Sequence, residues 1–307
     1  MRAAFFKTLA ELYQKDVNTY VLTADLGFKL FDDIKAGCPD RFYDIGVAEA
    51  NMGSISAGLS LSGKNVYCYS IIPFLIMRAF EQIRIDIAYH NLDVKLVGVG
   101  GGVTYGLEGF THFGLEDFAL MRSLPNMTIV VPADPVEAAC LAKISHRHKG
   151  PMYIRLGRNN EPSVHEKCPD FQIGKPIFLS EGKHVAILAI GSMVYIGKQL
   201  LNMLRGKGIT ATLVNVHTLR PLDAEVIKQV ASTHELIFSL EEHYVEGGLG
   251  TAIAEILAET RYNTCLKRIG VGKLTAHIGS AEYLREKYGL TADKIFHEIL
   301  NKLMENS

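Results

Sequence analysis

The stretch Asp44-Ile-Gly-Val-Ala-Glu-Ala-Asn (residues 44–51) places one carboxylate, that of Glu49, in an otherwise small and largely apolar run. Arg41-Phe-Tyr before it is typical of a short strand, and residues 52–61 after it, rich in Gly, Ser and Ala, indicate a closely packed helix. Glu49 is therefore predicted near a helix start, where free backbone N–H groups and the helix dipole favour a negative charge. A helix-start acid and a functional carboxylate both fit this position.

Outward from this stretch, apolar strand-like runs alternate with helical patterns along the whole chain. The first series of strands is predicted at 19–23, 66–70, 94–99, 127–131 and 153–156. A polar stretch at 157–170, which contains two prolines, has the character of a linker. A second series follows, with strands at 184–190, 210–216, 236–240 and 266–271 and helices at 194–206, 223–232 and 248–260. This alternation predicts two doubly wound α/β domains, the first with a mostly parallel sheet.

Composition limits the classes of function. The 307 residues, 48% of them hydrophobic, are enough for two cores, and a net charge of −1 provides no basic surface for nucleic acid or an anionic membrane. No uncharged run reaches the ~18 residues of a membrane span, and residues 1–16 form an amphipathic helix rather than a signal peptide. The five cysteines have an odd count and no C-x-x-C spacing, which argues against a disulfide framework or a zinc site. We expect core thiols and a cytoplasmic location.

Several further motifs accompany residues 44–51 in a fixed order. They are Phe74-Leu-Ile-Met-Arg-Ala-Phe-Glu-Gln, Gly106-Leu-Glu-Gly-Phe-Thr-His, Tyr153-Ile-Arg-Leu-Gly-Arg, His217-Thr-Leu-Arg-Pro-Leu-Asp, and Glu241-Glu-His with Gly247-Gly-Leu-Gly. The series resembles the transketolase family of thiamine diphosphate enzymes, including deoxyxylulose phosphate synthases and the beta subunits of 2-oxo acid dehydrogenases. The resemblance implies a pyrimidine-binding domain at 1–165, a linker at 166–180 and a transketolase C-terminal domain at 181–307.

The resemblance assigns cofactor-binding roles to three residues. Glu49 would be protonated and bonded to the aminopyrimidine ring of thiamine diphosphate, which makes it catalytic. Phe74 would stack on that ring, although Leu75 takes this place if the register slips by one. Asp25, in Thr23-Ala-Asp-Leu-Gly, resembles a position that lines the same site. A buried helix face is the alternative for the run 73–86, because Phe74, Met77 and Phe80 are spaced helically.

A glycine-dense loop at 98–109 leads to the other catalytic candidate, His112. The loop directly follows a predicted strand, where α/β sheets place ligands, and it lacks the Gly-Lys-Ser/Thr ending of a phosphate-binding P-loop. In transketolase-like proteins the histidine of a Gly-Pro-Thr-His motif contacts the donor's oxygen and helps proton transfer. Phe110 replaces the proline here and Glu108 the usual aspartate, which leaves substrate identity less defined than cofactor class.

Three arginines are the remaining substrate candidates. Arg158 resembles the family arginine that holds a substrate's terminal phosphate, a task suited to a forked guanidinium. A salt bridge at the domain boundary is the alternative for Arg158. Arg78 resembles an arginine that faces the substrate, with a solvated helix arginine as the alternative, and Arg2 resembles a residue that lines the same site.

The chain contains no Gly-Asp-Gly, the family segment that supplies oxygen ligands to the Mg²⁺ holding the cofactor's diphosphate. No metal ligand is therefore predicted here, and a separate N-terminal subunit is expected to provide the Mg²⁺ site, in an α2β2 assembly. The resemblance implies transfer of a two-carbon ketol unit from a ketose phosphate to an aldose. A deoxyxylulose phosphate synthase-like reaction, a 2-oxo acid dehydrogenase beta subunit and a non-catalytic assembly subunit stay open as alternatives.

Overall fold

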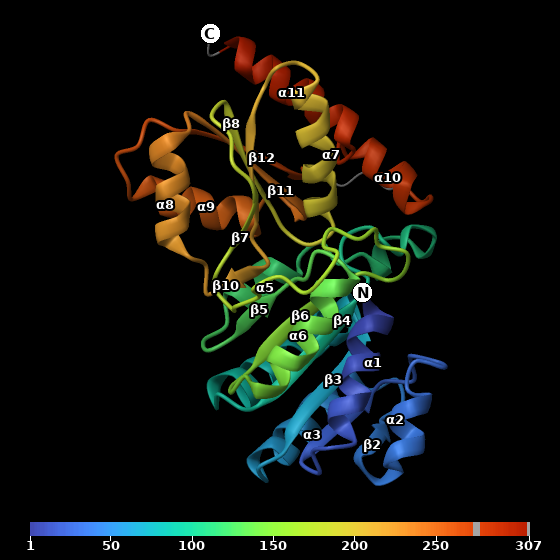
Figure 1. Ribbon diagram of the computed structural model, residues 1–307. Coiled ribbons are helices and arrows are strands. Elements are labelled where there is room, and N and C mark those ends of the chain that lie inside the picture. The colour runs from blue at the N-terminus through green and yellow to red at the C-terminus, as the bar shows by residue number, and fades with distance from the viewer. Residues whose placement is uncertain (273–276, 306–307) are drawn as a thin grey trace.

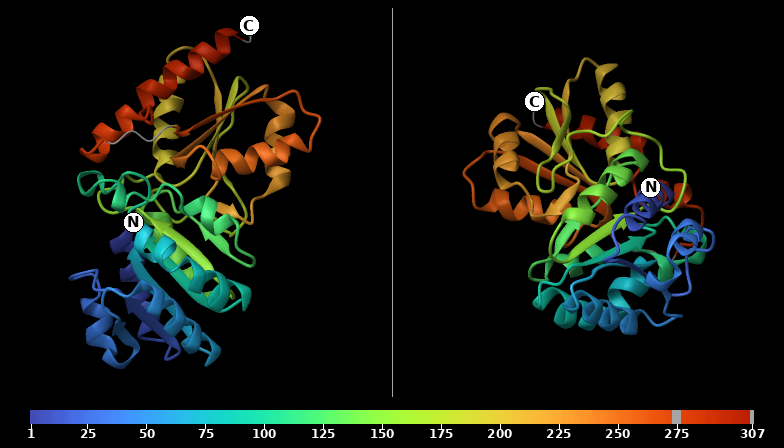
Figure 2. Two further views of the ribbon diagram at one scale, coloured as in Figure 1. Left: turned by 180° about the vertical axis from the view of Figure 1, so that it is seen from behind. Right: turned by 60° about the horizontal axis from the view of Figure 1, so that its bottom comes forward.

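The chain forms two lobes, each built on one β-sheet (Figure 1). The structure is a computed structural model that describes residues 1–272 and 277–305, so residues 273–276 and 306–307 of the predicted second domain lie outside the described part. The two further views agree that the N-terminal half of the chain, coloured blue to green, makes up most of one lobe and the yellow to red half most of the other (Figure 2). The predicted α/β class is confirmed.

The larger sheet has seven strands in the order β10-β5-β6-β4-β3-β1-β2. They are β1 (Thr19–Thr23), β2 (Phe42–Asp44), β3 (Asn65–Ile71), β4 (Val94–Val99), β5 (Thr128–Val130), β6 (Met152–Leu156) and β10 (Thr218–Arg220). Every neighbouring pair is parallel except β10 with β5. Parallel strands share one carboxyl edge, so the loops that follow β1, β2, β3, β4 and β6 converge.

Helices cover both faces of the larger sheet. They are α1 (Arg2–Tyr13), α2 (Asp32–Gly37), η1 (Pro39–Arg41), α3 (Glu49–Leu61), η2 (Pro73–Arg78), α4 (Phe80–Gln82), η3 (Ile83–Tyr89), η4 (Gly106–Glu108), η5 (Phe110–His112), α5 (Asp117–Arg122) and α6 (Pro135–Arg147). The side chains of β3 alternate: Tyr67 and Tyr69 pack with α1, whereas Val66 and Cys68 pack with α3. All seven residues of β3 are buried, as expected for a parallel strand covered on both faces.

The smaller sheet has five strands in the order β12-β11-β8-β9-β7. They are β7 (Ile177–Ser180), β8 (Val185–Ala189), β9 (Ala211–Asn215), β11 (Leu236–Tyr244) and β12 (Cys265–Val271), with helices α7 (Met193–Arg205), α8 (Ala224–Thr233), α9 (Leu249–Ala258), α10 (Ala281–Lys287) and α11 (Ala292–Glu305). The edge strand β7 pairs antiparallel with β9 and occupies the last four residues of the segment 166–180 that we predict as linker.

One strand crosses between the lobes. β10 lies in the chain between β9 and α8 of the smaller sheet, yet it pairs with β5 at the edge of the larger sheet. Val131 N–H donates to the His217 carbonyl oxygen at 2.8 Å beside this pair. Apolar side chains continue the connection, because one hydrophobic cluster contains Ile129 and Val131 from the first lobe and Ile190 from the second. The lobes are thus joined by both a sheet edge and a shared core.

The cysteine prediction is wrong in part. Cys140 of α6 and Cys168 of the connecting segment form a disulfide bond, although spacing and an odd count argue against one. Sequence spacing could not find this pair, because the fold brings together two cysteines that are 28 residues apart. Of the other three, Cys68 is the buried core thiol that we predict, Cys38 is half-buried and Cys265 is exposed.

Two titratable groups lie buried close together in β11 and give stability a specific pH dependence. Burial raises the pKa of Glu241 from 4.5 to about 7 and lowers the pKa of His243 from 6.5 to about 4. Between pH 4.5 and 7 the folded chain keeps a proton on Glu241 that the unfolded chain releases, so the free energy of unfolding falls as pH rises. Between pH 4 and 6.5 the unfolded chain binds a proton on His243 that the folded chain lacks, so the free energy of unfolding rises with pH.

We therefore expect Glu241→Gln to change the slope of stability against pH. Between pH 4.5 and 6.5 the two opposing slopes largely cancel in the parent, and removal of the Glu241 carboxyl leaves the rising slope of His243. The variant's free energy of unfolding should rise with pH relative to the parent's by roughly 1.4 kcal/mol for each pH unit. Urea unfolding followed by circular dichroism across this pH range measures it. Parallel curves for parent and variant would contradict the prediction.

Candidate functional site

The predicted site residues come from loops and helix starts at the carboxyl edge of the larger sheet. Asp25 follows β1, and Glu49 begins α3 shortly after β2. Phe74 and Arg78 lie in η2 after β3, His112 ends η5 in the long connection after β4, and Arg158 follows β6. Because these strands are parallel, the topology gathers segments that are far apart in the sequence.

Glu49 is a buried carboxylate that is bound by side chains from two other elements. Glu49 is only 1% exposed to solvent. Ser70 Oγ of β3 donates to Oε1 at 3.2 Å, and Arg78 Nη1 forms an ion pair with Oε2 at 2.7 Å. A simple helix-start acid would instead accept backbone N–H groups of its own helix, and none of the described hydrogen bonds of this carboxylate does so.

Phe74 lies between Arg78 and His112. The Arg78 guanidinium carbon is 4.9 Å from the centre of the Phe74 ring, and the centres of the Phe74 and His112 rings are 5.1 Å apart. Phe74 is half-buried, whereas Leu75 is 2% exposed and packs in the core. The register therefore turns Phe74, and not Leu75, toward Glu49's neighbour Arg78 and toward His112.

The rings of Phe74, His112 and Tyr105 form a row in which each ring contacts the next, and Tyr105 connects this row of rings to Arg158. The centres of the Tyr105 and His112 rings are 5.7 Å apart, and the Arg158 guanidinium carbon is 4.4 Å from the Tyr105 ring centre. Burial raises the pKa of the Tyr105 hydroxyl, so this ring stays neutral. Thr111 Oγ1 lies 3.0 Å from Nδ1 of His112, within hydrogen-bond distance.

Arg158 is partly exposed and pairs with Glu108. Its Nη1 is 3.3 Å from Glu108 Oε1, and the two side chains are 39% and 36% exposed. Solvent screens a pair with this exposure, which makes the pair a weak contributor to stability. Both residues belong to the first lobe, so the structure contains a salt bridge of Arg158 within that lobe, and the salt-bridge alternative stays open beside the anion-binding role. The guanidinium is accessible to a ligand.

Arg2 and Asp25 are the two remaining candidates. Arg2 contacts Tyr69 and Asn159, at 3.4 Å and 3.3 Å, and Asn159 is the neighbour of Arg158 in the chain. Asp25 is exposed and has a positive φ of 52°, and its backbone N–H donates to Asp44 Oδ1 at 2.8 Å. The structure thus brings Arg2 near Arg158, while no described hydrogen bond or ion pair joins the Asp25 side chain to the other candidates.

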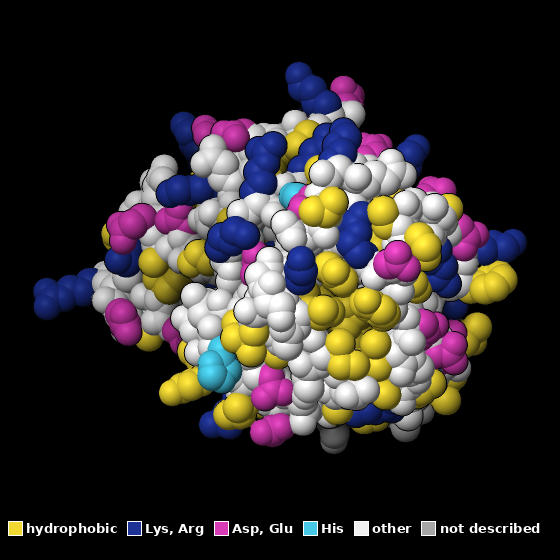
Figure 3. Space-filling view, turned by 90° about the horizontal axis from the view of Figure 1, so that it is seen from below, with side chains coloured by type: hydrophobic (Ala, Val, Ile, Leu, Met, Phe, Trp, Pro, Cys, Tyr) yellow, Lys and Arg dark blue, Asp and Glu magenta, His cyan; other side chains and the backbone are white. Residues whose placement is uncertain are grey.

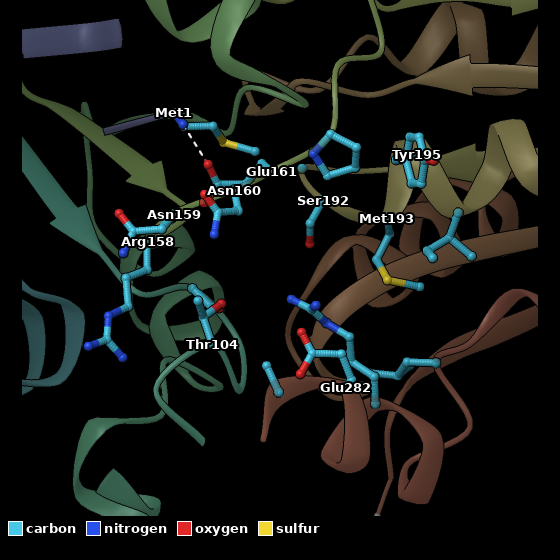
Figure 4. A pocket seen from close by; sticks show the side chains of 18 of the residues that line it. Met1, Thr104, Arg158, Asn159, Asn160, Glu161, Ser192, Met193, Tyr195 and Glu282 are labelled. Atoms are coloured by element: carbon cyan, nitrogen blue, oxygen red, sulfur yellow. Dashed lines mark hydrogen bonds and ion pairs between the residues drawn. The ribbon is translucent and has the colours of Figure 1, made fainter. Parts of the chain in front are cut away.

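A cavity of about 680 Å³ lies between the two lobes and adjoins the row of rings at Arg158 (Figure 4). Arg158, Asn159 and Thr104 line it from the first lobe, and Ser192, Met193 and Glu282 line it from the second. Glu49, Phe74 and His112 are not among its lining residues, so the cavity lies beside the candidate site and shares Arg158 with it.

Sequence reasoning missed three contributors: Ser70, Tyr105 and Tyr69. Ser70 and Tyr69 lie near the end of a continuous buried strand, where nothing in the pattern separates a functional side chain from a packed one. Tyr105 stands in the glycine-dense loop, where the one aromatic residue among the glycines was the available signal. In the described part of the chain, no three His, Cys, Asp or Glu side chains come close enough to hold a metal ion.

The fold and this site define an α/β protein of the class that binds ligands at the carboxyl edge of a parallel sheet. Residues 1–163 match the sequence profile of the transketolase pyrimidine binding domain, and residues 174–295 match that of the transketolase C-terminal domain. The chain belongs to the transketolase family.

Relatives of similar length support the same assignment. The chain is 37% identical to a 6-deoxy-6-sulfo-D-fructose transketolase subunit of Clostridium sp. (strain MSTE9), covering 98% of this chain and 95% of that one. It is 36% identical to one subunit of the apulose-4-phosphate transketolase of Phocaeicola vulgatus, with 96% and 94% covered. Among solved structures, a split gene transketolase described as an inactive beta4 tetramer superposes with a TM-score of 0.88 at 37% identity, over 99% of this chain and 97% of that one.

The family implies thiamine diphosphate, and the geometry at Glu49 fits its aminopyrimidine ring. The guanidinium of Arg78 is planar and rich in nitrogen, and it lies over the Phe74 ring while bonded to Glu49. Phe74 and Glu49 therefore already hold a planar nitrogen-containing group, the Arg78 guanidinium. Phe74 stacks on one side of this group, and the buried carboxyl of Glu49 binds its edge. An aminopyrimidine ring needs the same two contacts.

Proposed function

We propose that this chain is the C-terminal subunit of a split transketolase that moves a two-carbon ketol unit from a ketose phosphate to an aldose. The observation that carries the proposal is the placement of buried Glu49 beside Phe74 and Arg78, with His112 and accessible Arg158 along one row of rings. The division into residues 1–165, a linker at 166–180 and residues 181–307 belongs to this proposal, and so does a cytoplasmic location. None of the described helices is long and apolar enough to span a membrane.

Each site residue has a distinct proposed task. A protonated Glu49 would hold the pyrimidine ring nitrogen and share its proton with it, and Phe74 would stack on the ring. When bound, the cofactor supplies the electron sink for cleavage of the carbon–carbon bond next to a ketose carbonyl. His112 contacts the donor's oxygen and assists proton transfer, a role suited to imidazole. Arg158, with Arg2 nearby, binds the anionic end of the sugar. Arg78 would face the substrate once it is released from Glu49 in the assembled enzyme. Asp25 lines the cofactor-binding site.

The names of two relatives support an anionic sugar terminus. One acts on a sulfo-sugar and the other on a sugar phosphate, and sulfonate and phosphate both present oxygen atoms with negative charge. A guanidinium binds either group through charge-assisted hydrogen bonds. This supports Arg158 as an anion-binding residue.

We further propose that the chain works only with an N-terminal subunit that supplies the Mg²⁺ and diphosphate site, in an α2β2 assembly. Exposed apolar side chains near the site support a partner surface: Phe28 lies three residues after Asp25, Val47 two before Glu49, and Phe110 two before His112, with exposures of 91%, 71% and 56%. Apolar groups gathered around one site mark an interaction surface more often than single exposed ones do. The face seen from below also carries hydrophobic side chains grouped among charged ones (Figure 3), which supports self-association.

The isolated chain is expected to bind thiamine diphosphate and Mg²⁺ weakly or not at all. Without the Gly-Asp-Gly segment it offers the cofactor a ring site but no metal-bound diphosphate site. Isothermal titration of the chain alone, and of the chain mixed with a candidate partner that contains Gly-Asp-Gly, measures this. Tight, stoichiometric, metal-dependent binding by the chain alone would overturn the split arrangement.

Activity tests the reaction itself. The mixed subunits should shorten a ketose phosphate by two carbons in the presence of an aldose, and neither subunit should do so alone. Pyruvate serves as the competing donor, because a deoxyxylulose phosphate synthase-like enzyme would consume it and release CO₂. Turnover of pyruvate without turnover of a ketose phosphate would replace the proposed reaction.

A further inference from the structure

Glu242 is a buried carboxylate near the end of β11 in the second lobe, and it accepts hydrogen bonds from both lobes. It is 2% exposed. Its Oε2 accepts from Ser192 Oγ at 3.0 Å and from Arg285 Nε and Nη2 at 3.1 and 3.0 Å. Its Oε1 accepts from the backbone N–H of Val103, in the first lobe, at 3.0 Å. One carboxylate therefore ties the smaller sheet and its helices to the glycine-dense loop.

The loop is fitted closely to this side chain. Gly102 has a φ of +68°, and a Cβ placed on it would stand 2.3 Å from Cγ of Glu242. Only glycine combines this backbone conformation with so close an approach. Gly102 also exchanges two backbone hydrogen bonds with Gly114, at 2.9 and 3.0 Å. We call this bonded pair, Gly102 and Gly114, the stem of the loop. Both Tyr105 and His112 lie between the two residues of the stem in the chain.

The opposite side of the stem is held by a second buried group, Arg155. Its Nη2 donates to the Gly114 carbonyl oxygen at 2.6 Å and to the Glu242 carbonyl oxygen at 2.9 Å. Nε of Arg155 pairs with Asp117 Oδ2 at 2.9 Å, so the guanidinium itself is fixed. Both sides of the stem are therefore attached to the strand that carries Glu242.

We propose that Glu242 is a positioning residue through which the second lobe sets the place of the loop that carries His112. The residue does not touch the candidate site; it acts through Val103, Gly102 and the stem. This inference rests on the proposed function for its effect on the reaction, since His112 is assigned there to the substrate. The attachment of the loop to Glu242 can be tested without any activity.

Glu241 supplies a matched control in the same strand. It is equally buried, but its carboxylate accepts from the backbone N–H groups of Leu249 and Gly250 at 2.7 and 2.8 Å, within its own lobe. Loss of a buried carboxylate should therefore loosen the loop when it occurs at Glu242 and not when it occurs at Glu241. The glutamine variants keep side-chain volume, and Glu242→Ala removes the contact completely.

Hydrogen exchange of the isolated chain tests the attachment. In Glu242→Gln the side-chain N–H₂ group takes the place of an oxygen that accepts hydrogen bonds, so it meets another donor there and a hydrogen bond is lost. We therefore expect the backbone amides of residues 103–114 to exchange roughly tenfold faster than in the parent. Glu241→Gln should leave these amides unchanged. If Glu242→Ala does not fold, Glu242→Gln and Arg285→Gln still report on the loop. Equal exchange of residues 103–114 in the Glu241 and Glu242 variants would overturn the inference.

Kinetics of the mixed subunits test the consequence. We expect kcat per assembled site to fall between ~10- and ~100-fold in Glu242→Gln, the scale of a small misplacement of a reacting group, with KM for the ketose phosphate within about twofold of the parent. A change that only lowered the amount of folded protein would leave kcat per site unchanged. Faster loop exchange with an unchanged kcat would refute the positioning role. An inactive parent complex would refute the proposed function instead, and exchange would still decide the attachment.

Discussion

Replacing Glu49 by glutamine is expected to lower kcat of the assembled enzyme by roughly two orders of magnitude or more, the scale of lost acid–base assistance. Glutamine keeps the size of the side chain and can still accept from Ser70 Oγ, so assembly should survive. It cannot deliver the same proton to the pyrimidine ring nitrogen, and it loses the charge that pairs with Arg78. Steady-state kinetics of the mixed subunits, with assembly checked by size-exclusion chromatography, measures the effect.

Glu81→Gln is the control for this experiment. Glu81 lies in α4, close in the chain to Arg78, but it is exposed and its carboxylate contacts only the neighbouring Gln82 among the described hydrogen bonds. Its variant should keep the parent's kcat. Near-parent turnover in Glu49→Gln would mean that the carboxylate serves the start of α3 and the ion pair with Arg78, and that it takes no part in catalysis.

Arg158→Ala is expected to raise KM for a phosphorylated sugar by about ten- to a hundredfold. The lost contact is a charge-assisted hydrogen bond, worth roughly 1.5–3 kcal/mol. The phosphate lies far from the bond that breaks and is held in ground and transition states alike, so kcat should change little. A non-phosphorylated sugar should be a poor substrate for the parent and should barely respond to the substitution. Initial rates over a range of both substrates measure the difference.

The structure supplies a control through the partner of Arg158. Glu108 is its ion-pair partner in the described structure, so Glu108→Gln breaks the pair and leaves the guanidinium in place. If Arg158 mainly makes a structural pair, the two substitutions should have the same effect on every substrate. If it binds an anion, only Arg158→Ala should discriminate against the phosphorylated sugar. Equal losses for phosphorylated and plain sugars would require the anion-binding role to be withdrawn.

The regular part of the fold could be predicted because the sequence pattern is strong there. The strands at 19–23 and 94–99 have the predicted bounds, since each is a largely buried run in which apolar and β-branched residues predominate. The strand β10 was missed, because three residues with a polar neighbour, His217, carry no strand periodicity and their partner β5 is far away in the chain. The helical spacing of the run 73–86 indicates a helix, but η2 and η3 are π-helical, a difference to which apolar spacing is insensitive.

Sequence reasoning named part of the candidate site and did not give its contacts. The family resemblance named Glu49, Phe74, His112 and Arg158, and the parallel topology places all four at one edge of the larger sheet. The contact between Glu49 and Arg78 joins residues 29 positions apart, and its existence depends on how η2 is wound after β3. The disulfide between Cys140 and Cys168 likewise depends on where the connecting segment crosses α6. Contacts of this kind follow from tertiary packing, which single-sequence patterns do not contain.

The pairing of β10 with β5 limits how the chain can be recombined with its relatives. β10 enters the chain after residue 215, so a truncated chain that ends near residue 170 would leave β5 with an open strand edge, a template for aggregation. A chimaera that exchanges the second lobe would import a foreign strand into the larger sheet and a foreign counterpart of Glu242 under the loop of His112. The two lobes have distinct outlines but depend on each other for their structure. A chimaera should therefore exchange both lobes together.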